Sequence, residues 1–279
     1  MHPHAEAPAI TVLIAVYNQA RYISRAIDSI IHQTTDDWEL VLVDDGSTDG
    51  TSGIVDTCAS RDTRIVVRHL AQNRGLPSAL NEGLAIARGE FIARLDGDDI
   101  ALPDRLAMQR TFLDAHPGVG MVGGSIWYID SDDRKRGIGR YSTGPANVRA
   151  VAARGSAIAA PAMFIRRDCL TRLGGWRTAF TLSEDYDLTL RLLEIADVDN
   201  LDAVVTYYRS HDQQATRRYG GPQEAMAQIA RISAAARRVG QPDPIERDAP
   251  IGPSTVDALD VTPAEAERLR KLLPPGWMS

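Results

Sequence analysis

Three carboxylates fall within four positions in the stretch FIARLDGDDI, residues 91–100: Asp96, Asp98 and Asp99. Carboxylates crowded together repel one another unless a cation lies among them. Divalent metal sites of the Mg²⁺ and Mn²⁺ type often combine one or two protein carboxylates with the phosphate oxygens of a substrate. The stretch therefore poses a choice between a metal site, a neutralising Arg or Lys, and a hydrated acidic turn that caps the next helix.

Two further acidic pairs occur where the sequence changes from apolar to polar. Asp44 and Asp45 follow the mostly apolar residues 38–43 and begin the stretch DDGSTDG. Such a stretch is typical of an Asx turn followed by a helix start. Glu184 and Asp185 begin a segment with helical apolar spacing, where the helix dipole would stabilise their charges. Both pairs thus have a structural explanation beside a chemical one.

The elements around the first two clusters alternate regularly between strand and helix. Apolar runs predict strands at 9–17, 38–45, 64–70 and 90–95, and 3.6-residue periodicity predicts helices at 21–33, 50–60 and 75–89. This alternation favours a parallel sheet that is covered on both faces. In such sheets, ligands bind beyond the carboxyl ends of the strands. Four polar segments fall at those ends: 17–19, 44–49, 72–75 and 96–99.

The second half of the chain is less regular. Its patterns predict helices at 104–115, from 168, at 183–196, 222–240 and 263–272, and strands at 119–129, 160–167 and 203–211. Residues 130–145 read as an exposed, charged loop, and residues 241–279 are rich in Pro, Asp and Glu. We expect this last segment to be a tail that the chemical step does not need.

Composition narrows the class of protein. The chain has 279 residues, is 44% hydrophobic and carries a net charge of −6, so no basic field indicates a nucleic acid partner. Cys58 and Cys169 lie far apart, which argues against a disulfide framework. The longest apolar run, residues 10–17, is too short to span a bilayer, and residues 1–9 lack a basic signal-peptide region. We expect a soluble, cytoplasmic protein.

Five segments together resemble family 2 glycosyltransferases, which have the GT-A fold. They are VYN (16–18), LVDDGSTDGT (42–51), residues 72–99, LGGW (173–176) and SEDYDLTLRL (183–192). Each is weak alone, but the ordered set is specific and covers roughly residues 10–210. There are two departures from the family pattern: Ala15 stands where Pro is frequent, and Leu80 stands where many members have an Arg that could contact phosphate.

The resemblance implies a Rossmann-like, mostly parallel central sheet flanked by helices, with a C-terminal helical extension. Residues 1–100 would form the nucleotide-binding half, 101–220 the acceptor-binding half, and 221–279 a C-terminal helix and a Pro-rich charged tail. The implied activity is inverting transfer of a sugar from a nucleotide-diphosphate sugar to a hydroxyl of a glycan, lipid-linked or other acceptor. The implied cofactor is Mn²⁺ or Mg²⁺. Peripheral membrane contact and oligomer formation through the C-terminal helix are left open.

The resemblance also assigns roles to residues. The nucleotide site would comprise Val16, Tyr17, Asn18, Asp44, Asp45, Asn73, Arg74, Asp96 and Gly97. One carboxylate of the pair 44–45 would accept the N–H of a pyrimidine base, since a carboxylate only accepts, and the other would support the loop. The metal would be held by Asp96, Asp98 and His211. Asp185 would be the general base and Glu184 would shape the acceptor pocket.

Four further residues and two other functions stay open. Trp176 could stack on a sugar or lie in the core, and Arg209 could meet the metal or the diphosphate. Phosphate or an anionic surface could be reached by Arg217 and Arg218. One alternative is a sugar-phosphate nucleotidyltransferase, although no Gly-rich activation loop with a partner Lys occurs near the N-terminus. The other is a non-catalytic nucleotide-sugar-binding protein, which the intact acidic motifs argue against.

Overall fold

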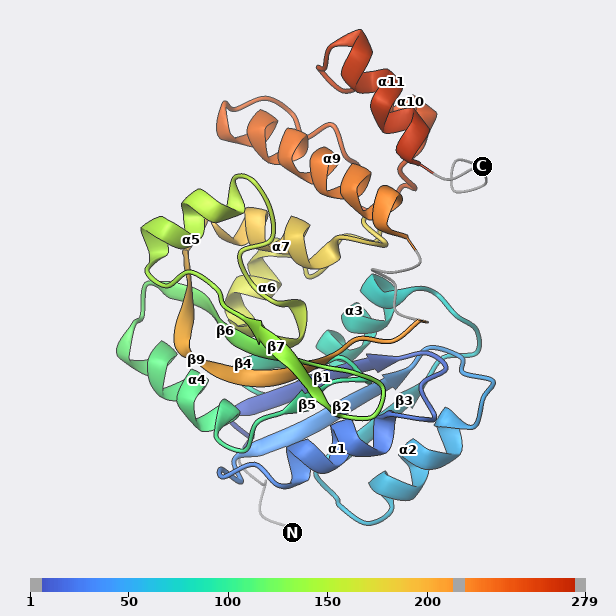
Figure 1. Cartoon of the computed structure of the whole chain (residues 1–279), viewed down its shortest axis with the longest axis vertical. Helices are drawn as coiled ribbons and strands as arrows, with labels where there is room; N and C mark the ends of the chain where they lie inside the picture. The colour runs from blue at the N-terminus through green and yellow to red at the C-terminus, as the bar shows by residue number, and fades with distance from the viewer. Residues whose placement is uncertain (1–6, 213–218, 274–279) are drawn as a thin grey trace.

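Parallel strands follow one another through the first hundred residues. The structure, a computed structural model, describes residues 7–212 and 219–273 (Figure 1). The elements of this half are β1 (Ile10–Val16), α1 (Ile23–Ile31), β2 (Trp38–Asp44), α2 (Thr51–Ala59), β3 (Ile65–His69), α3 (Leu76–Ile86) and β4 (Phe91–Arg94). The strands pair in parallel in the order β3-β2-β1-β4, and the register places Val16 beside Asp44 and Asp44 beside His69. The polar segments that follow these strands therefore meet at one edge.

The second half continues the same sheet with mixed directions. Its elements are β5 (Ile100–Ala101), α4 (Arg105–Ala115), β6 (Val119–Ile129), β7 (Lys135–Gly139), α5 (Pro145–Ala152), η1 (Ala160–Ala162), β8 (Phe164–Arg166), α6 (Arg167–Leu173), α7 (Glu184–Leu192), β9 (Asp197–Arg209), α9 (Gly220–Arg238), α10 (Pro253–Asp257) and α11 (Pro263–Leu272). The sheet order is β3-β2-β1-β4-β8-β6-β9-β5, with β7 paired to β6. Strand β8 is antiparallel to both neighbours, whereas β6 and β9 are parallel.

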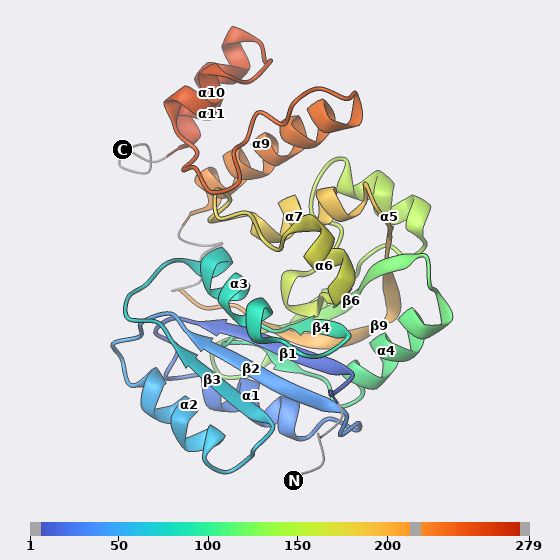
Figure 2. The same cartoon turned by 180° about the vertical axis from the view of Figure 1, so that it is seen from behind.

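Helices cover both faces of the sheet, as predicted. The β1 side chains alternate, so that Val12 and Ile14 pack on one face with α1, and Leu13 packs on the other with α3. Figures 1 and 2 show α1 and α2 on one side of the sheet and α3, α6 and α7 on the other. The α/β architecture expected from the alternation is confirmed.

Four strands differ from the sequence-based expectation: β5 was not expected, β8 covers only the end of the expected strand at 160–167, and β7 and β9 depart further. The segment 130–145, read as a loop, contains β7, which pairs along one side with β6 only and so keeps charged residues such as Lys135. Strand β9 begins at Asp197, six residues earlier than expected. Its early polar residues are buried because they bind backbone: Asp199 accepts from the Gly144 N–H at 2.7 Å, and Asn200 donates to Ser142 and Ala157 carbonyls.

The C-terminal extension is packed rather than an open tail. Helix α9 contacts α7, and α11 contacts both α9 and α10. Figure 1 shows this stack at the top of the molecule. Among the side chains described between residues 241 and 273, six apolar ones are buried: Ile245, Ile251, Val256, Leu259, Leu269 and Leu273. The charged and Pro-rich composition hid these apolar positions. Within residues 7–212 and 219–273, the structure contains no helix both long and apolar enough to cross a membrane.

Candidate active site

The loops after β1 and β2 are joined by hydrogen bonds at the carboxyl edge of the sheet. The Val16 carbonyl accepts a hydrogen bond from the Asp45 N–H at 2.8 Å. Asn18 adopts a left-handed conformation with φ of 54°, and its Oδ1 accepts from the Thr48 N–H at 2.8 Å. The side chain of Tyr17 is 44% exposed, so it is available to a ligand rather than packed in the core.

The Asp44 carboxylate is used in hydrogen bonds that hold the loop after β2 and its surroundings. Its buried carboxylate accepts hydrogen bonds from the Ser47 N–H at 3.0 Å, from Ser52 Oγ at 2.5 Å and from His69 Nδ1 at 2.9 Å. Burial acts to raise the pKa of Asp44, but these hydrogen bonds outweigh burial and lower it. The other ring nitrogen of His69 lies 2.9 Å from Asp56. Sequence analysis missed His69, because its partners are distant in the chain.

Asp45 holds the next loop and keeps acceptor capacity. Its Oδ1 accepts from the Arg74 N–H at 2.8 Å and its Oδ2 accepts from the Gly75 N–H at 2.9 Å. Each oxygen of a carboxylate has two lone pairs, so each retains one. Burial raises the pKa of Asp45 despite these bonds. The Arg74 side chain pairs with Glu82 at 2.7 Å, and Asn73 Oδ1 accepts from the Gly75 N–H at 3.2 Å.

The cation among the acidic residues after β4 is an arginine of the same strand. Arg94 is 2% exposed, and its guanidinium lies 3.1 Å from Asp96 and 3.0 Å from Glu184. Burial acts to lower the pKa of Arg94, but Asp96, Glu184 and Asp185 outweigh it and raise that pKa. Burial raises the pKa of Asp96. A neutralising Arg, one of the alternatives that the sequence left open, is thus present.

Asp98 and Asp99 face different partners. His211 Nε2 lies 2.8 Å from Asp98 Oδ2, and the His211 ring packs on that of Tyr22 with centroids 5.1 Å apart. Asp99 accepts from the Arg209 N–H at 2.7 Å, and burial raises its pKa well above the usual range. These contacts join the acidic stretch to the end of β9, more than 100 residues away.

Arg209 and Gly97 complete the packing around this stretch. The Arg209 side chain, which the sequence placed near phosphate, is fully buried, donates to the Asp98 carbonyl at 2.7 Å and packs over the Tyr22 ring. Its position therefore indicates a structural role. Gly97 is buried against Val16, where a Cβ would lie 3.1 Å from Val16 Cγ2. Arg217 and Arg218 lie outside the residues that the structure describes.

The donor atoms present fit a divalent cation that is shared with a ligand. Asp98 and His211 place one oxygen and one nitrogen side by side, whereas the Asp96 carboxylate is engaged by Arg94. The part of the chain that the structure describes holds no group of three or more His, Cys, Asp or Glu residues arranged for a metal. Mg²⁺-type sites commonly need only one or two protein ligands when phosphates supply the others. The pair Asp98 and His211 satisfies that requirement.

The acidic pair at the start of α7 divides into a buried and an open carboxylate. Glu184 is buried beside Arg94, and its pKa is raised to about 7, chiefly by burial. Asp185 is partly exposed, and its carboxylate makes no hydrogen bond or ion pair with any residue that the structure describes. An open carboxylate next to a buried ionic group can accept a proton from an incoming hydroxyl.

Trp176 belongs to the core and fixes the neighbouring loop. Its side chain is fully buried, which excludes stacking on a sugar in this structure. Its backbone exchanges two hydrogen bonds with the Asn81 side chain, at 2.8 and 2.9 Å. Leu80, the departure from the family pattern, is also buried. The segment LGGW is thus tied to α3.

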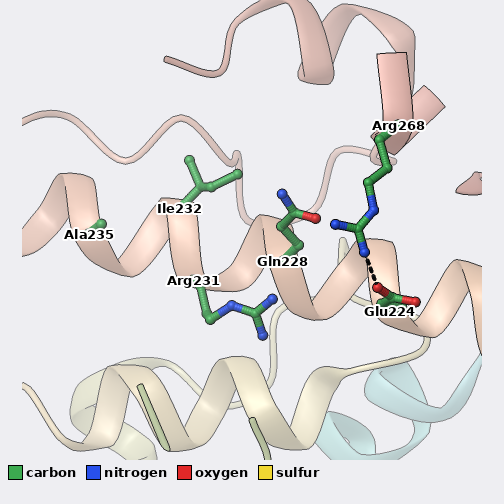
Figure 3. Close-up of a pocket in the computed structure, with 6 residues that line it drawn as sticks. All are labelled: Glu224, Gln228, Arg231, Ile232, Ala235 and Arg268. Atoms are coloured by element: carbon green, nitrogen blue, oxygen red, sulfur yellow. Dashed lines mark hydrogen bonds and ion pairs between the residues drawn. The ribbon is translucent and has the colours of Figure 1, made fainter. Parts of the chain in front are cut away.

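Two clefts lie away from this edge of the sheet. One, of about 370 Å³, is between α9 and α11, where Arg268 pairs with Glu224 (Figure 3). The other, of about 920 Å³, is lined by residues that include Arg88, Arg110 and Arg172. Neither is lined by the carboxylates at residues 44–45, 96–99 or 184–185.

The fold and the acidic edge together define a class of protein. The S. aureus TarS structure (residues 1–349) superposes with a TM-score of 0.63 at 20% identity, over 94% of this chain and 69% of that chain. The mannosyltransferase PcManGT from Pyrobaculum calidifontis, solved with GDP-Man and Mn²⁺, gives a TM-score of 0.63 at 22% identity, over 83% and 65% of the two chains. The fold is therefore that of the GT-A transferases, as predicted.

The sequence comparisons give the family. Residues 11–173 match the model of Glycosyl transferase family 2, and the chain belongs to this family. EpsE of Bacillus subtilis (strain 168) is 34% identical over 190 residues, 67% of each chain. The amylovoran biosynthesis glycosyltransferase AmsE of Erwinia amylovora is 27% identical over 82% of this chain and 87% of that protein. The match to EpsH of B. subtilis spans only 28% of that protein. The resemblance noted in the sequence is thus confirmed.

Proposed function

We propose that the protein is an inverting glycosyltransferase, which moves a sugar from a nucleotide-diphosphate sugar to an acceptor hydroxyl with the help of a divalent cation. The observation that carries the proposal is the pair at the start of α7. Glu184 is buried against Arg94, while the adjacent Asp185 carboxylate is partly exposed and makes no hydrogen bond or ion pair with a residue that the structure describes. One carboxylate is thereby left free to accept a proton beside a fixed ionic group.

Binding of the donor falls to the loops after β1, β2 and β3. Asp45 accepts the N–H of the base, because its oxygens keep free lone pairs, whereas Asp44 supports the loop through three hydrogen bonds. Tyr17 lies exposed at the same edge, and the exposed Arg74 side chain can leave the half-buried Glu82 for the diphosphate. The TarS complex with UDP-GlcNAc and the PcManGT complex with GDP-Man support a donor of this class.

Asp98 and His211 would hold the cation. A divalent ion bound there supplies positive charge to the leaving diphosphate, so that no protein acid is required. Asp96, which accepts a hydrogen bond from Arg94, would belong to the donor site two residues before Asp98. The Mn²⁺ in the PcManGT complex supports a metal in this fold.

Asp185 accepts the proton of the acceptor hydroxyl as the oxygen attacks the anomeric carbon. Attack on the face opposite the departing diphosphate inverts the configuration in a single step, and no second carboxylate is needed as a nucleophile. Glu184 and Arg94 shape the wall beside Asp185. The acceptor would be a glycan or lipid-linked glycan, and the function of AmsE in amylovoran biosynthesis supports such a substrate. A cytoplasmic location accords with this chemistry.

A donor screen followed by product analysis tests this function. The protein is scanned for thermal stabilisation by UDP-, GDP- and dTDP-sugars with Mn²⁺, since a ligand that binds the native state raises the melting temperature. Turnover of the stabilising donor should give a product whose anomeric configuration, measured by NMR, is opposite to that of the donor. Retained configuration would contradict the mechanism. Pyrophosphate release from a sugar phosphate and NTP would indicate a nucleotidyltransferase, and binding without turnover a binding protein.

The metal site has its own test. Asp98→Asn should weaken nucleotide diphosphate binding in the presence of Mn²⁺ and leave the metal-free affinity unchanged, because it removes one charged ligand. Isothermal titration calorimetry with and without Mn²⁺ measures both values. Full turnover of the unmodified protein in excess EDTA would remove the metal from the proposal.

A further inference from the structure

A buried ionic network lies beneath the start of α7. Asp187 is fully buried and accepts hydrogen bonds from Arg177 Nε at 3.1 Å and from Arg191 Nε at 2.8 Å. Residues two apart on a helix are rotated by about 200° around its axis and so lie on nearly opposite sides. Asp187 therefore faces the interior while Asp185 faces out, so the contacts of Asp187 set the rotation at which α7 presents Asp185.

The two arginines carry the network in different directions. Arg191 donates to the carbonyls of Leu173 and Gly175, at 3.1 and 3.0 Å, and so ties α7 to the segment LGGW. Arg177 reaches the C-terminal extension, where it pairs with Asp243 at 2.8 Å and donates to Ser233 Oγ at 3.1 Å. The network thus leaves the region of family resemblance, which ends near residue 210.

Asp243 connects several residues of the extension through its carboxylate. It accepts hydrogen bonds from Ser233 Oγ and from Arg237 Nη1, both at 2.6 Å, and from the Ile245 N–H at 2.9 Å. Burial acts to raise its pKa, but these partners and Arg177 outweigh burial and lower it. Arg237 in turn pairs with Glu194 at 2.8 Å, just beyond the end of α7.

The charges in this network balance. Three arginines, Arg177, Arg191 and Arg237, face three carboxylates, Asp187, Asp243 and Glu194. Breaking a buried ion pair by removing one partner leaves an uncompensated charge that must find a new arrangement. Loss of the Asp243 charge would therefore change the position of the Arg177 guanidinium and, through it, the contacts of Asp187.

We propose that Asp243 is a positioning residue, which acts through Arg177 and Asp187 to hold the Asp185 carboxylate in its reactive orientation. The inference rests on the proposed function only in giving Asp185 the proton-accepting role. The segment around Asp243 is then part of the catalytic half of the molecule, and the extension is needed for the chemical step. This reverses the expectation that residues 241–279 are dispensable.

The test compares Asp243→Asn with Asp257→Asn. Both remove one carboxylate charge from the extension, but Asp257 is exposed and, among the residues that the structure describes, pairs with Arg270 alone. Asp243→Asn should lower kcat about 10- to 100-fold with an unchanged KM for the donor, because small misplacements of a catalytic group cost rates of that order. Asp257→Asn should stay within twofold of the unmodified protein. A lower melting temperature with unchanged kcat would show a merely structural role and overturn the proposal.

A second readout separates this inference from the proposed function. Hydrogen exchange of peptides that cover residues 183–192 should become faster in Asp243→Asn and not in Asp257→Asn, whether or not a donor sugar is turned over. Unchanged exchange would overturn the positioning link. If the unmodified protein transfers no sugar while exchange responds as expected, the proposed function fails and the link stands. Ser233→Ala, which removes one donor to Asp243, should show the same changes to a smaller extent and serves if Asp243→Asn does not fold.

Discussion

At the scale of residues, the acidic stretch after β4 is organised by distinct basic partners. Arg94 lies between Asp96 and Glu184, His211 faces Asp98, and the Arg209 backbone binds Asp99. The sequence located these carboxylates correctly, because they crowd into a few positions at a strand end. The family resemblance also grouped His211 with these carboxylates, but it did not predict that Arg94 pairs with Asp96 and Glu184 or that the Arg209 N–H binds Asp99, because Glu184 and Arg209 are distant in the chain. These contacts distinguish the proposed roles. Asp98 and His211 would bind the cation, Asp96 is paired with Arg94, and the Asp185 carboxylate makes no hydrogen bond or ion pair with a described residue.

Glu184 should make stability depend on pH in a defined direction. Its pKa is raised to about 7 in the folded protein, from an ordinary value of 4.5, so the native state binds this proton more tightly than the unfolded chain. The stabilisation is complete below pH 4.5 and is lost as pH rises towards 7. Relative to Glu184→Gln, the unmodified protein should lose on the order of 1–3 kcal/mol of unfolding free energy between pH 5 and 8. Chemical denaturation across that range measures the difference, and a constant difference would contradict the burial of an ionisable Glu184.

At the scale of elements, the loops at the carboxyl edge support one another. The strands and helices of residues 10–94 followed from apolar periodicity, because both faces of the sheet are buried and each helix has one apolar side. The loop contacts did not follow, since Asp45 binds the turn at 74–75 and Asn18 binds Thr48 through geometry that only the assembled sheet creates. The β7 strand was not predicted because it pairs with β6 alone and stays largely exposed, so its sequence lacks the apolar residues that indicate a buried strand.

Gly46 should be the most sensitive position of these loops. Gly46 and Gly50 both have positive φ, at 74° and 96°, but a Cβ on Gly46 would lie 2.7 Å from the Gln72 backbone while one on Gly50 would meet nothing within 4 Å. Gly46→Ala should therefore destabilise the protein by at least about 1 kcal/mol more than Gly50→Ala, which carries only the cost of the left-handed backbone. Thermal denaturation compares the two. Equal losses would show that the loops after β2 and β3 are not in close contact.

At the scale of the whole molecule, the extension α9–α11 completes the half that carries α7. Its role was not readable from the sequence, because six buried apolar residues are scattered among prolines and charges. The family match ends at residue 173, and beyond it Arg177 pairs both with Asp187 on α7 and with Asp243 in the extension. Removal of residues 241–279 would therefore expose apolar surface on α9 and leave Arg177 with one partner fewer.

Two valines measure how tightly the extension is packed. Val256 on α10 is 1% exposed, whereas Val239 at the end of α9 is 71% exposed. Val256→Ala should cost about 2 kcal/mol of unfolding free energy, from two buried methyl groups and the cavity they leave. Val239→Ala should change stability by less than about 0.5 kcal/mol. Equally small effects of both substitutions in denaturant titrations would show that α10 does not share the core.

The central claim is that Asp185 takes the proton of the acceptor hydroxyl, and the turnover of Asp185→Asn tests it most directly. Asparagine keeps the shape of the side chain but cannot accept that proton, so donor affinity should be unchanged while kcat falls about 10²–10⁴-fold. Asp202→Asn is the matched control, since Asp202 is exposed on β9 and should leave kcat unaltered. An Asp185→Asn protein that binds the donor normally and retains near-normal kcat would contradict the account.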